Sequence, residues 1–113
     1  SGDLSAMKRM TYMEFSSKRE ELDLRLIDVR EADEFALVHV KGAELFPLSR
    51  IRFGEIPVKD ARTVALICRS GARSAMAASI LESQGFTETI NIEGGTLAAI
   101  AEGPEHVEKQ GPR

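Results

Sequence analysis

Residues 64–74 constrain the fold more than any other stretch of the chain. They begin with four consecutive apolar residues, Val64-Ala65-Leu66-Ile67, and continue through Cys68, the one cysteine of the sequence. From Arg73 the pattern becomes helical and runs to a glycine at position 85. An apolar run without polar alternation is typical of a strand that is buried on both faces of a parallel sheet. The sequence therefore predicts a buried strand that is followed, after a short loop, by a helix.

Cys68 occupies the point where this strand ends and the helix begins. Amide groups at a helix N-terminus have no partner within the helix, and the helix dipole adds partial positive charge there. Such a loop can bind an anion and stabilise a reactive thiolate. The candidate binding residues are those that follow the cysteine: Arg69, Ser70, Gly71, Ala72, Arg73 and Ser74. The alternative is a structural cysteine beside two solvated arginines; the coincidence of cysteine, glycine and arginines at one loop favours the reactive cysteine.

The rest of the chain alternates between strand and helix patterns. We expect strands at 9–11, 24–29, 43–46 and 87–92, and helices at 12–21, 31–36, 48–53 and 96–101. The residues Thr11 and Glu14 form a capping-box pattern that opens the first of these helices. Such alternation predicts an α/β fold with a mainly parallel sheet, and 113 residues is the usual size of one domain.

Composition argues against several classes of function. The net charge of −3 gives no reason to expect a nucleic acid or an acidic membrane as a partner. No apolar run approaches the roughly 20 residues that a membrane-spanning helix needs. One cysteine cannot form an internal disulfide, and no Cys/His cluster has metal-ligand spacing. We therefore expect no metal, no cofactor, and a reducing compartment, the cytoplasm.

The loop Cys-Arg-Ser-Gly-Ala-Arg-Ser at 68–74 resembles the active-site loop of the single-domain rhodaneses, a family of sulfurtransferases. Three further stretches are similar to motifs of that family and follow in the same order: 26–31 with Glu34-Phe35, 39–43, and 91–95. Together the four motifs cover roughly residues 10–101. The resemblance implies a rhodanese-like, three-layer α/β/α fold with a mainly parallel five-stranded sheet.

The resemblance also implies a reaction in two steps. Cys68 would take the outer sulfur of a small anionic donor such as thiosulfate, which leaves a cysteine persulfide, and would pass it to a thiol or a protein cysteine. The amides of residues 69–74 would hold the terminal sulfur of the persulfide. Arg69 and Arg73 would orient the donor. We expect a monomer or a weak homodimer.

Two other functions remain open. Related domains that act as phosphatases or arsenate reductases carry five residues between the cysteine and the arginine of the loop. This chain carries four, residues 69–72, and the smaller cradle suits a sulfur atom better than a phosphoryl group. Other rhodanese-like domains are non-catalytic modules that bind a protein partner. Such modules frequently lose the cysteine, which this chain retains.

Three residues outside the loop are candidates for supporting roles: Asp28, Arg30 and His39. Asp28 could act as a general base, but an acid beside a wanted thiolate would oppose its formation, so we favour a role in fixing a turn. Arg30 is predicted, with Glu31, to fix the same turn. His39 could activate the thiol. Its position in a turn before the next strand favours a structural role, and the resemblance implies that the matching position mainly organises that loop. This stretch departs from the family pattern, because Val38 stands where the family usually carries a glycine.

We divide the chain into a polar lead-in at 1–8, whose first two residues look like a cloning remnant, a rhodanese-like domain at 9–103, and a polar tail at 104–113. We predict that the tail is disordered and that His106 lies in solvent. The family commonly places a tryptophan shortly after the double glycine, and this chain has no tryptophan. We therefore expect Leu97 and Ile100 to be buried in its place.

Overall fold

The structure, a computed structural model, describes residues 8–110. The elements follow in the order β1 (Lys8–Thr11), α1 (Tyr12–Lys18), β2 (Arg25–Asp28), α2 (Ala32–Leu37), β3 (His39–Val40), β4 (Glu44–Leu45), α3 (Leu48–Arg52), β5 (Val64–Ile67), α4 (Ala72–Ser83), β6 (Thr89–Glu93), α5 (Gly95–Glu102), the 3₁₀ helix η2 (Pro104–His106) and β7 (Val107–Glu108). The α/β alternation expected from the sequence is confirmed.

Five of these strands form one sheet in the order β1-β6-β5-β2-β4, and every pairing within it is parallel. The strand β5 lies at the centre, and all four of its residues are buried, as the unbroken apolar run predicts. Strand β4 pairs with one edge of β2, and β5, which follows β4 along the chain, pairs with the other edge of β2. The direction in which strands are added to the sheet therefore reverses between β2 and β5. Parallel α/β sheets bind ligands at such a reversal, outside the carboxyl ends of the strands.

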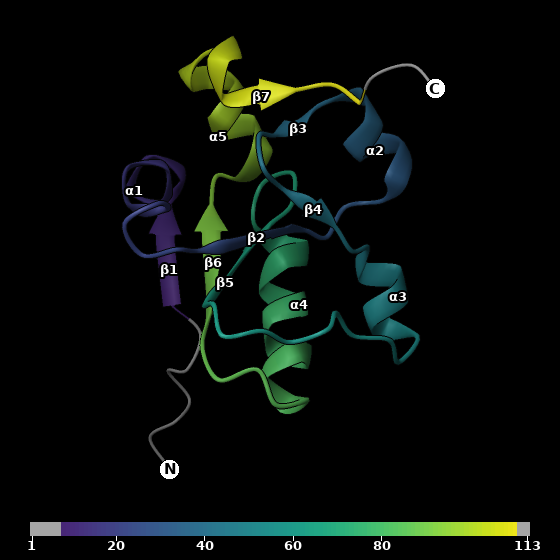
Figure 1. Cartoon of the computed structure of the whole chain (residues 1–113). Helices are drawn as coiled ribbons and strands as arrows, with labels where there is room; N and C mark the ends of the chain where they lie inside the picture. Colours follow the sequence, from purple (N-terminus) through teal and green to yellow (C-terminus); the bar gives the residue numbers. More distant parts are fainter. Residues whose placement is uncertain (1–7, 111–113) are drawn as a thin grey trace.

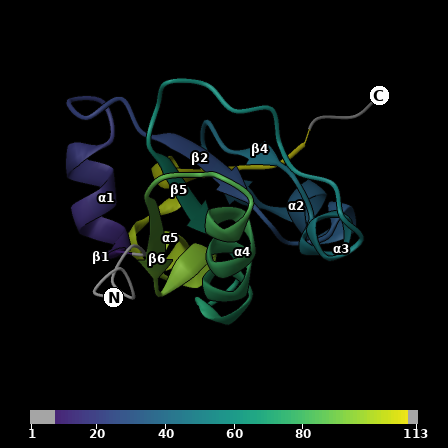
Figure 2. The same cartoon turned by 90° about the horizontal axis from the view of Figure 1, so that it is seen from below.

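Helices cover both faces of the sheet, as Figures 1 and 2 show. Alternate residues of β5 enter the two cores: Val64 and Leu66 pack with α3 and α4, whereas Ala65 and Ile67 pack with α1 and α5. The three-layer α/β/α arrangement is therefore confirmed. Helix α2 buries none of its residues fully and lies near the carboxyl ends of the strands.

The N-terminal region follows its local sequence signals closely. The Thr11 hydroxyl accepts a hydrogen bond from the Glu14 amide, and the Glu14 carboxylate accepts one from the Thr11 amide. This capping box opens α1, which ends at Lys18, earlier than predicted. Of the predicted lead-in, residues 1–7 lie outside the described part of the chain, and Lys8 already belongs to β1.

The C-terminal region differs from the prediction of a disordered tail. Residues 104–106 form η2, and β7 pairs antiparallel with β3. The ring nitrogen Nδ1 of His106 lies 2.8 Å from the hydroxyl of Tyr12, so His106 is held against α1 rather than solvated. The prediction was wrong for residues 104–108 because backbone pairing with β3 depends little on side-chain polarity. Residues 111–113 lie outside the described part.

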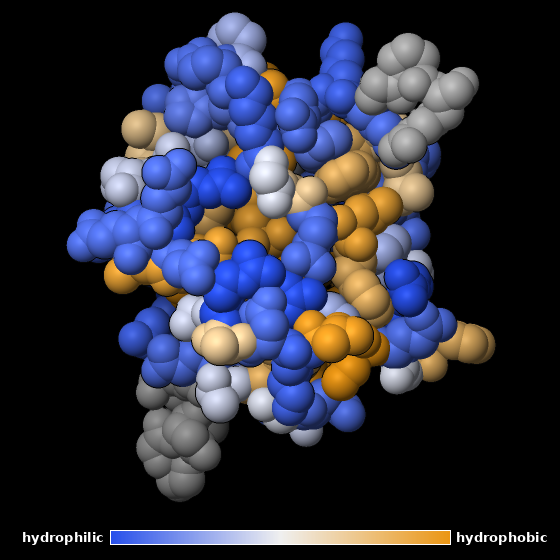
Figure 3. Space-filling view, in the orientation of Figure 1, coloured by the Kyte–Doolittle hydropathy of each residue, from blue (hydrophilic) through white to orange (hydrophobic). Residues whose placement is uncertain are grey.

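The expected burial of Leu97 and Ile100 is also wrong. Their exposed fractions are 42% and 44%, and α5 instead packs through its small residues Gly95, Thr96 and Ala99. Small side chains let this helix approach the loop after β5 closely, which leaves the large residues on its outer face. In the view of Figure 3, hydrophobic surface gathers around α2, β4 and α3, within a largely hydrophilic face. No helix within residues 8–110 is long and apolar enough to cross a membrane.

Candidate active site

Cys68 lies directly after β5, and only 1% of its surface is exposed. Its Sγ atom accepts hydrogen bonds from the amides of Gly71 at 3.1 Å and Ser74 at 3.3 Å, and the Ser74 hydroxyl lies 3.4 Å away. The loop closes around the sulfur because Gly71 adopts a φ of +124°, which residues with a side chain rarely adopt. Helix α4 begins at the next residue, so the sulfur sits at a helix N-terminus, as predicted.

These contacts determine the acidity of the thiol. Burial by itself raises the pKa of Cys68 because it disfavours the charged form. Hydrogen bonds from the Ser74 hydroxyl and from the amides of Ser74, Gly71 and Ser70 outweigh this effect, and the net result is a pKa below the ordinary value of a cysteine. The loop therefore favours the thiolate, which is the nucleophilic form.

A second set of contacts holds the hydroxyl of Ser74. This oxygen is also within hydrogen-bond distance of the Gly71 carbonyl, at 3.2 Å, and of the side-chain oxygen of Asn91. The amide nitrogen of Asn91 donates to the same Gly71 carbonyl. A hydroxyl has one hydrogen, so it can donate to Asn91 while the thiol is protonated and to the sulfur once the thiolate forms. The sequence placed Asn91 in a family motif but gave it no role in the site.

Helix α5 holds the backbone of the loop. The amide and the hydroxyl of Thr96 both donate to the carbonyl of Cys68, at 2.9 and 3.1 Å, and the Leu97 amide donates to the carbonyl of Arg69. A side chain at Gly95 would place its Cβ 2.4 Å from the Cys68 carbonyl oxygen, which only glycine avoids. The absence of a side chain at Gly95 therefore allows α5 to come close to the cysteine loop.

Asp28 and Arg30 fix the turn that follows β2. The fully buried Asp28 carboxylate accepts hydrogen bonds from the Arg30 amide at 3.0 Å and from its guanidinium at 2.9–3.2 Å. The guanidinium also donates to the Val38 carbonyl at 2.6 Å. Arg30 thus fixes this turn with Asp28 rather than with Glu31, whose carboxylate accepts from Ser49. The position of Asp28 agrees with a structural role.

His39 lies in β3 rather than in a turn, and its ring stacks on that of Phe35 with 3.7 Å between the centroids. Its two ring nitrogens lie 2.8 Å from the Phe35 carbonyl and 3.2 Å from the Glu108 carboxylate. These contacts occupy both nitrogens and tie α2 to the C-terminal segment. The geometry therefore gives His39 a structural position rather than a place beside the sulfur.

The two loop arginines have different surroundings. Arg73 donates two hydrogen bonds to the Glu34 carboxylate, at 2.7 and 2.9 Å. Chiefly because of these bonds, the pKa of Glu34 falls to about 2. Arg69 is exposed, and within residues 8–110 no carboxylate forms an ion pair with it. Arg69 is therefore the loop cation that is free to meet an anion, whereas the predicted donor-binding role of Arg73 competes with Glu34.

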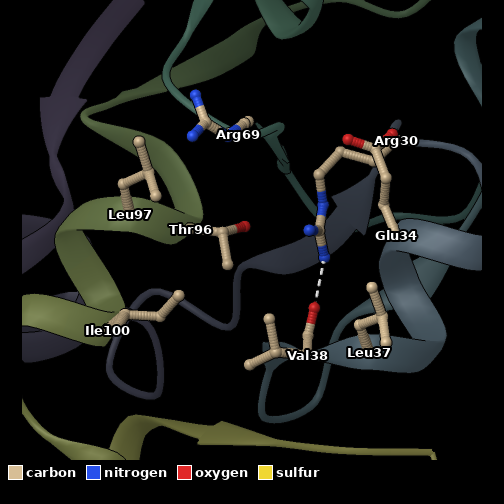
Figure 4. A pocket seen from close by; sticks show the side chains of 8 residues that line it. All are labelled: Arg30, Glu34, Leu37, Val38, Arg69, Thr96, Leu97 and Ile100. Atoms are coloured by element: carbon tan, nitrogen blue, oxygen red, sulfur yellow. Dashed lines mark hydrogen bonds between the residues drawn. The ribbon is translucent and has the colours of Figure 1, made fainter.

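The loop lies between two hollows. One, of about 190 Å³, opens between α2 and α5 and is shown in Figure 4; its lining residues are Arg30, Glu34, Leu37, Val38, Arg69, Thr96, Leu97 and Ile100. The other, of about 450 Å³, lies on the far side of the loop and is lined by Arg9, Ser70, Gly71, Ala75, Asn91 and Glu93. Within residues 8–110, no group of three or more His, Cys, Asp or Glu side chains is arranged to hold a metal ion.

The fold and the site define a parallel α/β domain in which a hydrogen-bonded cysteine directly follows the central strand. Comparison with known families narrows this class. The family model for the rhodanese-like domain matches residues 11–102, and the chain belongs to this family.

Individual relatives agree with that assignment. A sulfurtransferase of Allochromatium vinosum is 40% identical over 91 residues, which cover 79% of this chain and 83% of that protein. The protein named probable adenylyltransferase/sulfurtransferase MoeZ of Mycobacterium tuberculosis is 42% identical over 77 residues, which cover 66% of this chain. The match covers only 20% of that longer protein. The crystal structure of a rhodanese-like domain protein from Staphylococcus aureus superposes with a TM-score of 0.77 at 29% identity, over 93% of this chain and all of that chain.

Proposed function

We propose that this protein is a sulfurtransferase that moves a sulfur atom from a small anionic donor, such as thiosulfate, to a thiol acceptor through a persulfide on Cys68. The observation that carries the proposal is the set of hydrogen bonds on the Cys68 sulfur at the N-terminus of α4. Membership of the rhodanese-like family supports it, as do the relatives that are named sulfurtransferases.

The first step is a displacement at sulfur. The Cys68 thiolate attacks the outer sulfur of thiosulfate; a new S–S bond forms, the S–S bond of thiosulfate breaks, and sulfite leaves with the electron pair. The lowered pKa of Cys68 raises the fraction of the thiol that is present as the thiolate at a given pH. Arg69, which has no carboxylate partner in the described region, attracts the donor anion. The loop amides stabilise the negative charge on the outer sulfur of the product persulfide.

The second step returns the enzyme to its starting state. An acceptor thiolate attacks the outer sulfur, the bond between the two persulfide sulfurs breaks, and Cys68 leaves as a thiolate. A thiol with a lowered pKa is a better leaving group in such exchanges. The same hydrogen bonds that favour the nucleophile in the first step therefore favour its departure in the second. Because the cycle needs reduced thiols, we propose that the protein works in a reducing compartment, the cytoplasm. We also propose that it acts as a monomer or a weak homodimer.

A non-catalytic protein-binding module is the second candidate. The observation that favours it is the burial of Cys68, which is 1% exposed and closed over by its loop. A reactive role requires the loop to admit a donor to this sulfur.

Steady-state release of sulfite from thiosulfate, with cyanide as the acceptor, separates the two candidates. We expect turnover by the natural chain and a loss of about 10³-fold or more in Cys68→Ser, as removal of a nucleophile produces. Circular dichroism of the variant checks that the fold is kept. Turnover that survives in folded Cys68→Ser contradicts the proposal, and absence of turnover by the natural chain with thiosulfate and other anionic donors favours the binding module.

A further inference from the structure

The cavity between α2 and α5 has an apolar wall that the transfer of a small inorganic anion does not use. In Figure 4, Leu97 and Ile100 of α5 face Leu37 of α2 across the cavity. These side chains stay partly in water, with exposed fractions of 42%, 44% and 72%. A cluster of large, exposed apolar side chains beside a reactive centre is typical of an interaction surface.

All but one of the charged side chains that line the cavity already form hydrogen bonds or ion pairs within the protein. Arg30 is bound to Asp28 and to the Val38 carbonyl, and Glu34 is bound to Arg73. Arg69 stands at the rim beside Leu97 and has no carboxylate partner within residues 8–110. A ligand that fits this surface therefore combines an apolar group for the wall with a negative charge for Arg69.

The size of the cavity indicates what carries those groups. Pockets that enclose a whole drug-sized molecule measure about 300–1,000 Å³, whereas this one measures about 190 Å³. It accommodates one large apolar side chain. The exposed Leu37 extends the apolar surface beyond the cavity, which suits a longer partner lying across the rim better than a small molecule held inside.

The cavity adjoins the residue next to the cysteine. Arg69 directly follows Cys68, and Thr96, which lines the cavity, donates to the Cys68 carbonyl. A chain segment seated here is therefore within a few residues of the sulfur. A donor such as thiosulfate has no apolar group with which to fill the wall, so the acceptor is the better match.

We propose that the cavity between α2 and α5 docks an acceptor protein through a segment in which the receiving cysteine is flanked by a large apolar residue and an acidic residue. The apolar side chain enters between Leu37 and Ile100, and the acid pairs with Arg69. This inference rests on the proposed function. In the transfer step the partner's thiolate bonds to the outer sulfur of the persulfide, Cys68 leaves as a thiolate, and the proton of the partner's thiol has gone to solvent.

Single-turnover transfer from the persulfidated protein to short peptides tests the proposal. The protein is first loaded with thiosulfate and desalted. The acceptors are the capped peptides Gly-Leu-Cys-Glu-Gly and Gly-Glu-Cys-Leu-Gly, with matched peptides in which Leu is replaced by Ser or Glu by Lys. Of the two peptides that contain both Leu and Glu, we expect the faster one to react about tenfold faster than the matched peptide with Ser in place of Leu or Lys in place of Glu. A factor of this size corresponds to the burial of part of one leucine or to one well-placed charge.

Substitutions in the apolar wall test whether the cavity causes this preference for peptides. Ile100→Ser and Leu37→Ser should bring the Leu and Ser peptides within about twofold of each other, while loading with thiosulfate and transfer to cyanide stay unchanged. Leu22→Ser is the matched control, because Leu22 is 48% exposed and lies outside the cavity; it should keep the full preference.

Each contrary result has its own meaning. Equal rates with all peptides, or a preference that survives Ile100→Ser, overturn the docking site and leave the sulfurtransferase intact. Transfer to 3-mercaptopropionate that is as fast as to the best peptide, and equally sensitive to Ile100→Ser, overturns it in favour of a small-molecule site. If no persulfide forms in the loading step, the proposed function itself fails.

Discussion

The two sides of the cysteine loop differ in polarity and in exposure to solvent. Toward Asn91 and α4, the polar groups next to the sulfur are buried and paired with one another: the sulfur, the Ser74 hydroxyl and the Asn91 side-chain amide form one connected set. The side that faces α2 and α5 is apolar and open, with Leu37 and Ile100 partly in solvent. A buried network of paired polar groups is suited to controlling the protonation of a thiol, whereas an open apolar surface is suited to binding a partner.

The largest effect we expect comes from Gly95→Ala, which disturbs the buried side. The added Cβ would lie 2.4 Å from the Cys68 carbonyl oxygen and 2.5 Å from that of Arg69, so the loop or α5 must move. We expect a loss of about 2–4 kcal/mol in the free energy of unfolding, measured in urea, and a large loss of sulfur transfer.

Gly54→Ala is the control, because Gly54 also has a positive φ, +104°, but an added Cβ there meets nothing within 4 Å. This variant should lose about 1 kcal/mol and keep its activity. Equal effects of the two variants would show that backbone strain, rather than contact with the cysteine loop, accounts for the loss.

The next effect concerns the hydroxyl of Ser74. Ser74→Ala removes a hydrogen bond that lowers the pKa of Cys68, so this pKa should rise and the thiolate should be scarcer at neutral pH. We expect the rate of alkylation by iodoacetamide at pH 7 to fall about tenfold and the midpoint of its pH profile to move upward. Ser83→Ala on the same helix, where the hydroxyl binds the Ile80 carbonyl, should leave the profile in place; an unmoved midpoint in Ser74→Ala would contradict the account of the thiol.

A smaller effect distinguishes the two arginines. Arg69→Gln removes the loop cation that has no carboxylate partner within residues 8–110. It should raise KM for thiosulfate about fivefold with little change in stability. Arg73→Gln leaves Glu34 without its partner, so it should cost about 1 kcal/mol of stability and change KM less. Steady-state kinetics and urea unfolding of both variants check this. The reverse order of effects would return Arg73 to the donor-binding role that the sequence predicts.

The smallest effect is a change in how stability depends on pH in acid. The pKa of Glu34 is lowered to about 2 in the folded protein, against 4.5 for an unperturbed glutamate, so its ion pair stabilises the fold fully above about pH 4.5. As the pH falls from about 4.5 to about 2, the unfolded chain takes up the proton first and this contribution is lost. Glu34→Gln should therefore flatten the dependence of urea stability on pH in this window, and an unaltered slope would contradict the lowered pKa.

The sequence predicted the features that depend on neighbours along the chain. The buried strand, the cysteine at its end, the capping box at Thr11 and the order of the motifs all lie in short contiguous patterns. It missed the contacts that join distant segments. Nothing local shows that Thr96 would hold the Cys68 carbonyl, 28 residues away, or that Glu34 would occupy Arg73, 39 residues away.

Two errors at the C-terminal end have the same origin. The polarity of residues 104–108 predicted a free tail, but their backbone pairs with β3, and polarity carries no information about that partner. Leu97 and Ile100 were expected to be buried in place of the tryptophan that the family commonly carries. The close approach of Gly95 to the loop sets the rotation of α5 and turns these two residues outward.

In the proposed reaction Cys68 carries the transferred sulfur, and intact mass spectrometry after brief exposure to thiosulfate tests this role most directly. We predict a gain of one sulfur atom that maps to the peptide containing Cys68, disappears with dithiothreitol and is absent from Cys68→Ser. A natural chain whose mass stays unchanged with thiosulfate and with other sulfur donors, or a folded Cys68→Ser variant that gains the same sulfur, would contradict the account.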